Sequence, residues 1–116
     1  MRSLRLLAPA ILFLATGCHS AFIDATISNH TDKPLSPVEV DYPSASLGTE
    51  TLAPNQDFHY RFKVQGTGDL KLIYTDSAHT EHTAAGPHLA EGDEGSLTVT
   101  VTPSGVEWSP HLAPHR

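Results

Sequence analysis

The 116-residue chain carries seven Lys and Arg against thirteen Asp and Glu, so its net charge is −6, and it has a single Cys. An acidic chain without a basic face disfavours nucleic acid and a purely electrostatic hold on anionic lipid. One Cys excludes an internal disulfide and a Cys-rich zinc site. The length suits one small domain.

The first 17 residues have the pattern of a secretion signal. Arg2 and Arg5 precede an apolar run from Leu6 to Ala15, and small residues follow this run. A transmembrane helix needs about 20 apolar residues, so this run is too short to span a bilayer. The order of a basic, an apolar and a small-residue segment therefore predicts a leader that is removed.

The end of the leader, Leu14-Ala15-Thr16-Gly17-Cys18, resembles the lipobox of bacterial lipoproteins, where small residues precede an obligatory Cys. The resemblance implies that the leader is cut before Cys18 and that its thiol receives a diacylglycerol. The new amino group would be acylated, and residues 18–21 would form a short membrane tether. Ala15 stands where the family prefers Leu.

Two further points concern this anchor. The residue after Cys18 is His19 and not Asp. In an organism with two membranes the resemblance therefore implies the outer membrane, with the domain facing the periplasm. The alternative is ordinary cleavage after Gly17, since Ala15-Thr16-Gly17 also fits the small-x-small cleavage rule. Cys18 would then be a free thiol of a secreted protein.

Beyond the leader, apolar and polar residues alternate in runs that are typical of strands with one buried and one solvated face. These runs are Ile23–Ile27, Val38–Tyr42, Phe58–Val64, Leu70–Tyr74, Leu97–Val101 and Val106–Trp108. The clearest run predicts a buried face formed by Phe58, Tyr60, Phe62 and Val64. Its solvated face would carry His59, Arg61 and Lys63.

Turn-forming residues separate these runs, and no segment after the leader has the apolar spacing of a helix. Six or seven short strands predict an all-β antiparallel sandwich over residues 22–109, immunoglobulin-like or transthyretin-like, with a small barrel as the alternative. Two segments resemble bacterial immunoglobulin-like domains, Asn29–Tyr42 and Leu52–Phe62. Residues 110–116 are expected to form a flexible tail.

Three of the eight His form a cluster, His79, His82 and His88. A zinc site needs three or four ligands in a fixed geometry. On a strand, residues three apart point to opposite faces, so His79 and His82 would share a metal only through a turn or bulge. The alternative interpretation is an exposed polar hairpin that binds no cofactor.

The aromatic residues Tyr42, Tyr60, Tyr74 and Trp108 fall mainly on the alternating apolar faces. Core packing explains such positions, whereas a partner surface would need several of them exposed together. Trp108, near the C-terminal edge, is the first candidate for a partner surface. We find no G-x-S-x-G segment and no Gly-rich phosphate loop, so nothing points to nucleophilic or phosphoryl-transfer chemistry.

Taken together, these patterns predict a non-catalytic interaction or accessory module of the cell envelope. It would be held at the membrane by lipid on Cys18 and would bind an envelope protein, without a cofactor and without nucleic acid. Two alternatives stay open: a metal-handling lipoprotein that uses the three histidines, and an inhibitor of a cell-wall hydrolase.

Overall fold

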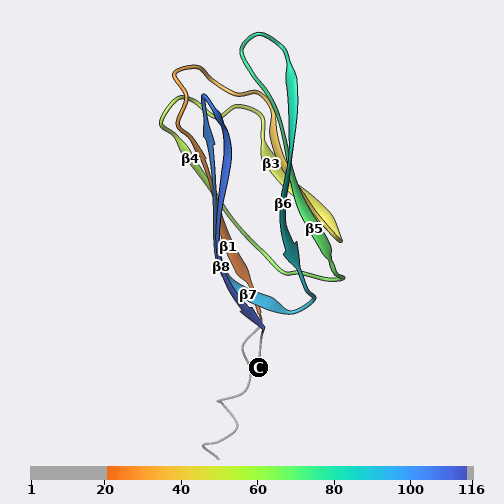
Figure 1. The fold of residues 1–116 in the computed structure, drawn as a ribbon. Helices are drawn as coiled ribbons and strands as arrows, with labels where there is room; N and C mark the ends of the chain where they lie inside the picture. Colours follow the sequence, from red (N-terminus) through yellow and green to blue (C-terminus); the bar gives the residue numbers. More distant parts are fainter. Residues whose placement is uncertain (1–20, 115–116) are drawn as a thin grey trace, which may run out of the picture.

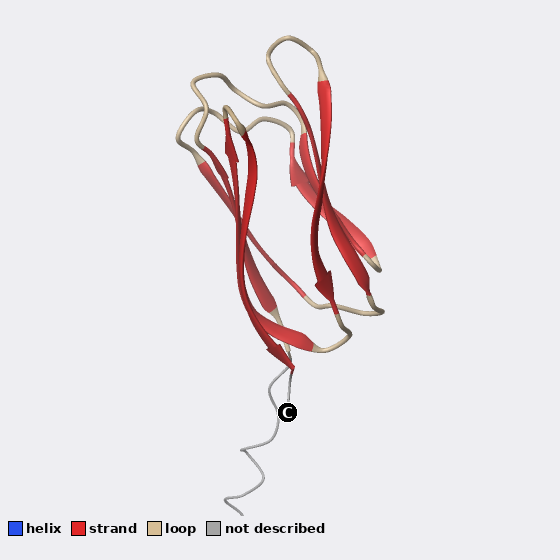
Figure 2. Ribbon diagram, viewed as in Figure 1, coloured by secondary structure: helices blue, strands red, loops and turns tan. Residues whose placement is uncertain are grey.

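The computed structural model describes residues 21–114, and within this range the chain forms eight β-strands and no helix (Figure 1, Figure 2). The strands are β1 (Ile23–Asn29), β2 (Val38–Tyr42), β3 (Ala45–Thr49), β4 (Asp57–Phe62), β5 (Gly68–Thr75), β6 (Glu81–Leu89), β7 (Asp93–Thr102) and β8 (Gly105–Pro114). In this part of the chain, no helix has the length and apolar character needed to cross a bilayer.

The strands form two four-stranded sheets that face each other. The first sheet has the order β4-β1-β7-β8 and the second the order β3-β2-β5-β6. Strands β1 and β7 are parallel, and every other neighbouring pair is antiparallel. The predicted all-β sandwich is therefore confirmed, and the barrel alternative is wrong because both sheets have free edges.

The strand order can be compared with that of an immunoglobulin domain. An immunoglobulin constant domain has seven strands in sheets ABED and CFG. Here each sheet has four strands, and the first strand pairs in parallel with the seventh. This arrangement departs from the strand order of an immunoglobulin constant domain.

The core lies between the sheets and is built by alternate residues of the central strands. Each of these strands has a neighbour on both sides, so its inward side chains are covered completely. They include Ile23, Ile27, Val38, Val40, Leu70, Leu72, Leu97, Val99 and Val101, each at most 2 % exposed. The alternation predicted for these strands is confirmed.

The pairing also fixes which parts of the chain lie at each end of the sandwich. Ile23 at the start of β1 is opposite Gly95, and Pro114 at the end of β8 is opposite Asp93, so both lie at the same end. Four connections lie at the other end, which we call the loop end: residues 30–37, 50–56, 76–80 and 103–104.

The clearest predicted run is confirmed in register, but two of its four inward positions are not buried. Phe62 and Val64 are buried, and the residues of the polar face, His59, Arg61 and Lys63, are exposed. Phe58, however, is only half-buried, and Tyr60 is 46 % exposed. The reason is that β4 is an edge strand, so no further strand covers the outer flank of its inward side chains.

The predicted flexible tail is wrong over residues 110–114. Strand β8 continues to Pro114 and stays paired with β7, with Pro110 opposite Leu97. Proline ends most strands because it cannot donate a backbone hydrogen bond, but an edge strand needs partners on one side only. Strand β8 is the edge of the first sheet, and it therefore accommodates two prolines.

Candidate functional site at the loop end

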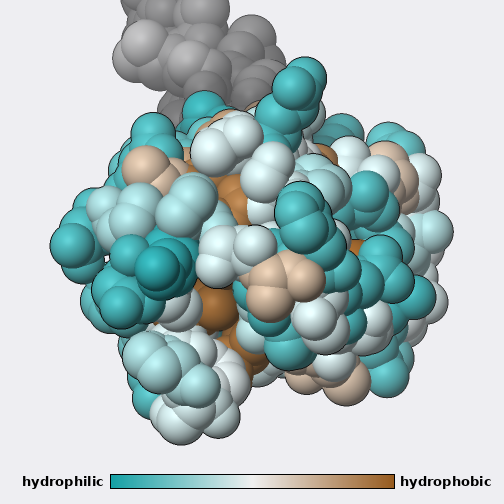
Figure 3. Space-filling view, turned by 90° about the horizontal axis from the view of Figure 1, so that it is seen from above, coloured by the Kyte–Doolittle hydropathy of each residue, from teal (hydrophilic) through white to brown (hydrophobic). Residues whose placement is uncertain are grey.

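A pocket of about 260 Å³ opens at the loop end, between the two sheets. Leu35, Tyr74 and Val101 contribute buried apolar surface to its lining. Figure 3 looks onto this end and shows apolar surface at the bottom of a hollow between hydrophilic groups. The pocket thus combines an apolar floor with a polar rim, which is the usual composition of a binding site.

The rim owes its shape to Asp76, which organises the loop between β5 and β6. The Asp76 Oδ1 atom accepts hydrogen bonds from the backbone N–H groups of Ala78 and Thr80, at 2.9 and 3.0 Å. His79 stands at the tip of this loop with φ 65°, a conformation that few residues other than Gly adopt. A short polar side chain at position 76 is therefore what lets the loop turn.

Asp76 also positions His82, the first inward residue of β6. The His82 Nε2 atom lies 2.7 Å from Asp76 Oδ2. The imidazole stacks on the ring of Tyr74 with centroids 4.8 Å apart and an angle of 16° between the rings. The hydrogen bonds from His82 and from the loop backbone lower the pKa of Asp76, so this carboxyl is ionised at neutral pH.

The phenol of Tyr74, in contrast to the carboxyl of Asp76, stays neutral. Its burial, together with the negative charge of Asp76, raises the pKa of the phenol. Both oxygens of Asp76 are already engaged within the protein. The Asp76–His82 pair therefore serves to hold the loop over Tyr74, and it does not present a free carboxylate base to the pocket.

Lys33, on the loop between β1 and β2, contributes a cation to the lining of the pocket, next to Asp32. Among the described residues we find no ion pair that involves its ammonium group. Asn29, which is fully buried, donates to the carbonyls of Lys33 and Leu52 and so fixes the backbone of this loop. An apolar group in the pocket would meet a positive charge at the rim, next to a rigid loop.

The three histidines proposed as metal ligands are not brought together. His82 and His88 are six residues apart on β6, a distance of about 20 Å along a strand. Each of these two histidines contacts a different carboxylate. His82 pairs with Asp76, and His88 Nδ1 lies 2.7 Å from Asp69 Oδ1 on the outer side of the second sheet. Within residues 21–114 no group of three or more His, Cys, Asp and Glu has a geometry that would hold a metal ion.

Trp108, the predicted partner surface, is half-buried and packs between the sheets. Its ring lies over Gly86 of β6, where an added Cβ would come within 2.7 Å of Trp108 Cη2. The ring thus closes the side of the sandwich where β6 meets β8. In the described part of the chain, the large apolar side chain left exposed is Tyr60 instead.

Cys18, the predicted lipidation site, lies outside the described residues. In the sequence Tyr74 stands out only as an aromatic residue of an apolar strand face, and Lys33 and Asp76 do not stand out. The three residues come together only through the fold. One local signal was available: Asp76-Ser77-Ala78 is a sequence in which the Asp side chain can accept from the backbone N–H two residues later.

Comparison with known proteins adds a fold relationship. No known family profile matches the chain, and no curated protein is similar in sequence. A protein from Eubacterium rectale, whose structure was determined by NMR, is similar in fold with a TM-score of 0.56 and 10 % identity. The similarity covers 76 % of this chain and 86 % of that chain. At this identity it supports the sandwich architecture alone.

Proposed function

We propose that this protein is a lipid-anchored, non-catalytic module of the cell envelope that binds a partner protein with its loop end. The lipobox-like segment that ends at Cys18 supports the anchor. The pocket between the two sheets supports the binding role, because its apolar floor and charged rim suit one apolar side chain of a partner.

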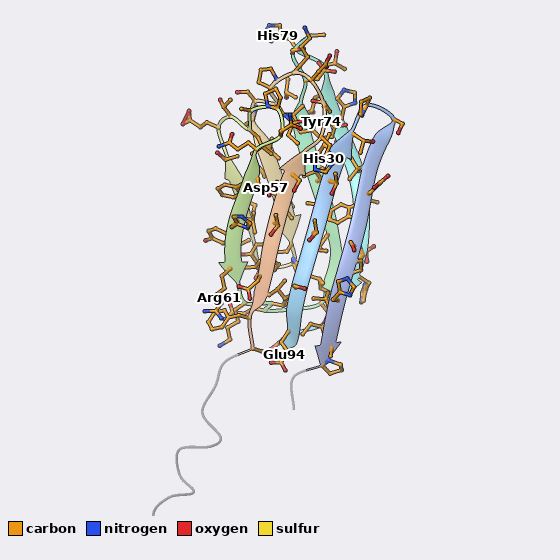
Figure 4. All side chains as sticks on the ribbon, turned by 90° about the vertical axis from the view of Figure 1, so that its left-hand side faces the viewer. His30, Asp57, Arg61, Tyr74, His79 and Glu94 are labelled. Carbon is orange, nitrogen blue, oxygen red and sulfur yellow. The ribbon has the colours of Figure 1, made fainter. Side chains whose placement is uncertain are left out.

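The observation that carries this proposal is the position of the pocket relative to the start of the domain. Strand β1 begins at Ile23 and runs for seven residues toward the loop end, a length of about 23 Å. Figure 4 shows the same relation, with Glu94 near the end where β1 begins and His79 at the far end. A tether before Ile23 would therefore leave the pocket facing away from the membrane.

The anchor is tested with the Cys18→Ser variant of the full chain. The thiol is the only group that could accept the diacylglycerol, so we expect wild type to carry acyl chains and the variant to carry none. Intact-mass measurement and membrane fractionation after a high-pH wash report this directly. Acyl chains contribute about 0.8 kcal/mol per buried CH₂, so wild type should resist the wash. A soluble wild-type product with an unmodified Cys18 would refute the anchor.

The binding role is tested separately, by photo-crosslinking in living cells. A benzophenone side chain is placed at Ala78, on the exposed rim of the pocket, and in a control at Ala113, at the opposite end. We expect a discrete crosslinked protein from position 78 that is absent from position 113. Equal products from both positions, or none from position 78 in the native envelope, would contradict a partner at the loop end.

A further inference from the structure

The edge strands on the two sides of the sandwich differ in how well they are protected from pairing with another strand. On one side, β6 contains Pro87 and β8 contains Pro110 and Pro114. The pairing of β6 with β5 is also irregular between Asp69 and Lys71. Proline and bulges of this kind are two of the features by which natural sheets prevent another strand from pairing at an edge. The ring of Trp108 closes the gap between the two strands.

The other side, formed by β3 and β4, has none of these features in the described residues. Neither strand contains proline, and β4 pairs with β1 in one unbroken register over six residues. Strand β4 has β1 as its neighbour on one side and no strand on the other. Its outer backbone therefore offers a regular row of hydrogen-bonding groups.

Strand β4 is held rigidly in place by a ladder of side chains on the outer face of the first sheet. Three directly opposed pairs connect it to β1: Ser28 donates to Asp57 at 2.7 Å, Thr26 hydrogen-bonds His59 at 3.0 Å, and Arg61 Nε lies 3.3 Å from Asp24 Oδ1. Cross-strand pairs of this kind stabilise a sheet. The edge is thus preorganised and would lose little freedom on binding.

The inner face of the same edge carries aromatic side chains. Tyr60 is 46 % exposed and stacks on Phe58, with ring centroids 6.4 Å apart. Phe62 is buried next to them and contacts Tyr42 at a centroid distance of 4.3 Å. A strand added beside β4 would cover the exposed part of Tyr60 with its own inward side chains.

On the outer face of this edge, basic side chains gather at one end, where Arg61 pairs with Asp24, and the acidic Asp57 lies at the other end. Residues 21–114 contain four Lys and Arg and thirteen Asp and Glu. Two of the four basic residues, Arg61 and Lys63, lie at the end of β4, and Figure 4 shows Arg61 on this outer strand. Lys63 is exposed and makes no ion pair with the described residues. A partner segment with acidic side chains beside this end of β4 would match the charge of Lys63.

We propose that β4 is a docking edge that takes up an extended segment of a partner protein as an additional strand. The segment would alternate apolar residues, which face Tyr60, with acidic residues, which face Arg61 and Lys63. Main-chain hydrogen bonds would supply affinity, and the alternate side chains would supply specificity. A second copy of this chain is a poorer occupant, because two domains that each carry thirteen acidic and four basic residues repel each other.

The test uses two blocked eight-residue peptides, one alternating Glu and Val and the other alternating Lys and Val. Each is titrated into the ¹⁵N-labelled protein, purified from cells that express the full chain. We expect the Glu peptide to shift amide signals of residues 57–63 and to slow hydrogen exchange on β4. The Lys peptide should bind at least tenfold more weakly, and added salt should weaken the Glu peptide because the charged groups are exposed.

Two variants probe the two faces of the edge. Lys63→Glu should weaken the Glu peptide about fivefold, since opposed charge pairs on neighbouring strands contribute up to about 1 kcal/mol. Lys71→Glu makes the same change of charge on the outer face of the second sheet and should leave the affinity within twofold. Tyr60→Thr should weaken the peptide further while the circular dichroism spectrum stays that of a β protein.

Several results would overturn the proposal. They are equal affinity for both peptides, signal changes centred on β3, β6 or β8, equal effects of Lys63→Glu and Lys71→Glu, and no binding at millimolar peptide. Concentration-dependent dimerisation that protects β4 amides without peptide would assign this edge to a second copy instead. None of these readouts depends on the pocket at the loop end, so the two proposals fail independently.

Discussion

The contact between Gly86 and Trp108 predicts whether the substitution Gly86→Ala stabilises or destabilises the fold. Replacing a strand Gly by Ala normally stabilises a protein by about 0.5–1 kcal/mol, because the unfolded chain loses freedom. At position 86 the new methyl group would lie 2.7 Å from Trp108 Cη2 and Cζ2 and 2.9 Å from Cζ3. Overpacking of this kind costs about 1–3 kcal/mol. We therefore expect Gly86→Ala to destabilise the fold by about 0.5–2 kcal/mol.

Urea unfolding followed by circular dichroism measures this difference in every variant, including the control that lacks Trp108, the only tryptophan of the chain. In a domain of this size 1 kcal/mol corresponds to a shift in Tm of about 4–8 °C, so thermal unfolding gives a second reading. The control is the same substitution in a Trp108→Ala background, where the steric conflict is gone and Gly86→Ala should become stabilising. A stabilising Gly86→Ala in wild type, or equal effects in both backgrounds, would show that the ring does not occupy this space.

Three further changes test other parts of the structure. Phe62→Ala should cost about 3–5 kcal/mol in unfolding free energy because the ring is buried, whereas Tyr60→Ala on the same face should cost less than about 1 kcal/mol. Asp76→Asn should lower Tm at pH 7, because the pKa of Asp76 is lowered in the folded state and its charged form therefore stabilises the fold above the ordinary Asp pKa of about 3.9. The difference in Tm between wild type and variant should shrink as the pH falls below that ordinary value and through the lowered one. Zinc or copper at micromolar excess should leave Tm unchanged, since His82 and His88 lie about 20 Å apart; a rise that disappears in His79→Ala and His82→Ala would instead indicate a metal site.

The central strands could be predicted from the sequence, and the edges could not, for one physical reason. A strand with neighbours on both sides must fill its inward positions with large apolar residues, as Leu97, Val99 and Val101 do. An edge strand has a neighbour on one side only, so its inward positions need not carry large apolar residues. Strand β6 places His82, Ala84 and Gly86 on its inward side, a pattern that carries no apolar alternation and was interpreted as a polar hairpin.

The candidate site was hidden for a related reason. Lys33, Tyr74 and Val101 lie on segments far apart in the chain, and they meet at one pocket only because the loops of both sheets emerge at the same end. Asp76 and His82 are close in sequence, yet their spacing alone does not reveal that their side chains are hydrogen-bonded. A tight turn with His79 in a left-handed conformation is needed to bring the two side chains together.

The difference between the two sides of the sandwich links the docking edge to the proposed anchor. Every exposed edge strand could pair with the edge of another molecule. On the β6 and β8 side, such pairing is hindered by three prolines, an irregular strand pairing and the ring of Trp108. Strand β4 instead combines a rigid ladder with an exposed Tyr60. It extends along the long direction of the domain, with Asp57 toward the loop end and Phe62 at the end where β1 begins (Figure 4). With a tether before Ile23, a segment paired with β4 would lead from the membrane side toward the pocket, so one partner could occupy both surfaces at once and gain affinity from the second contact.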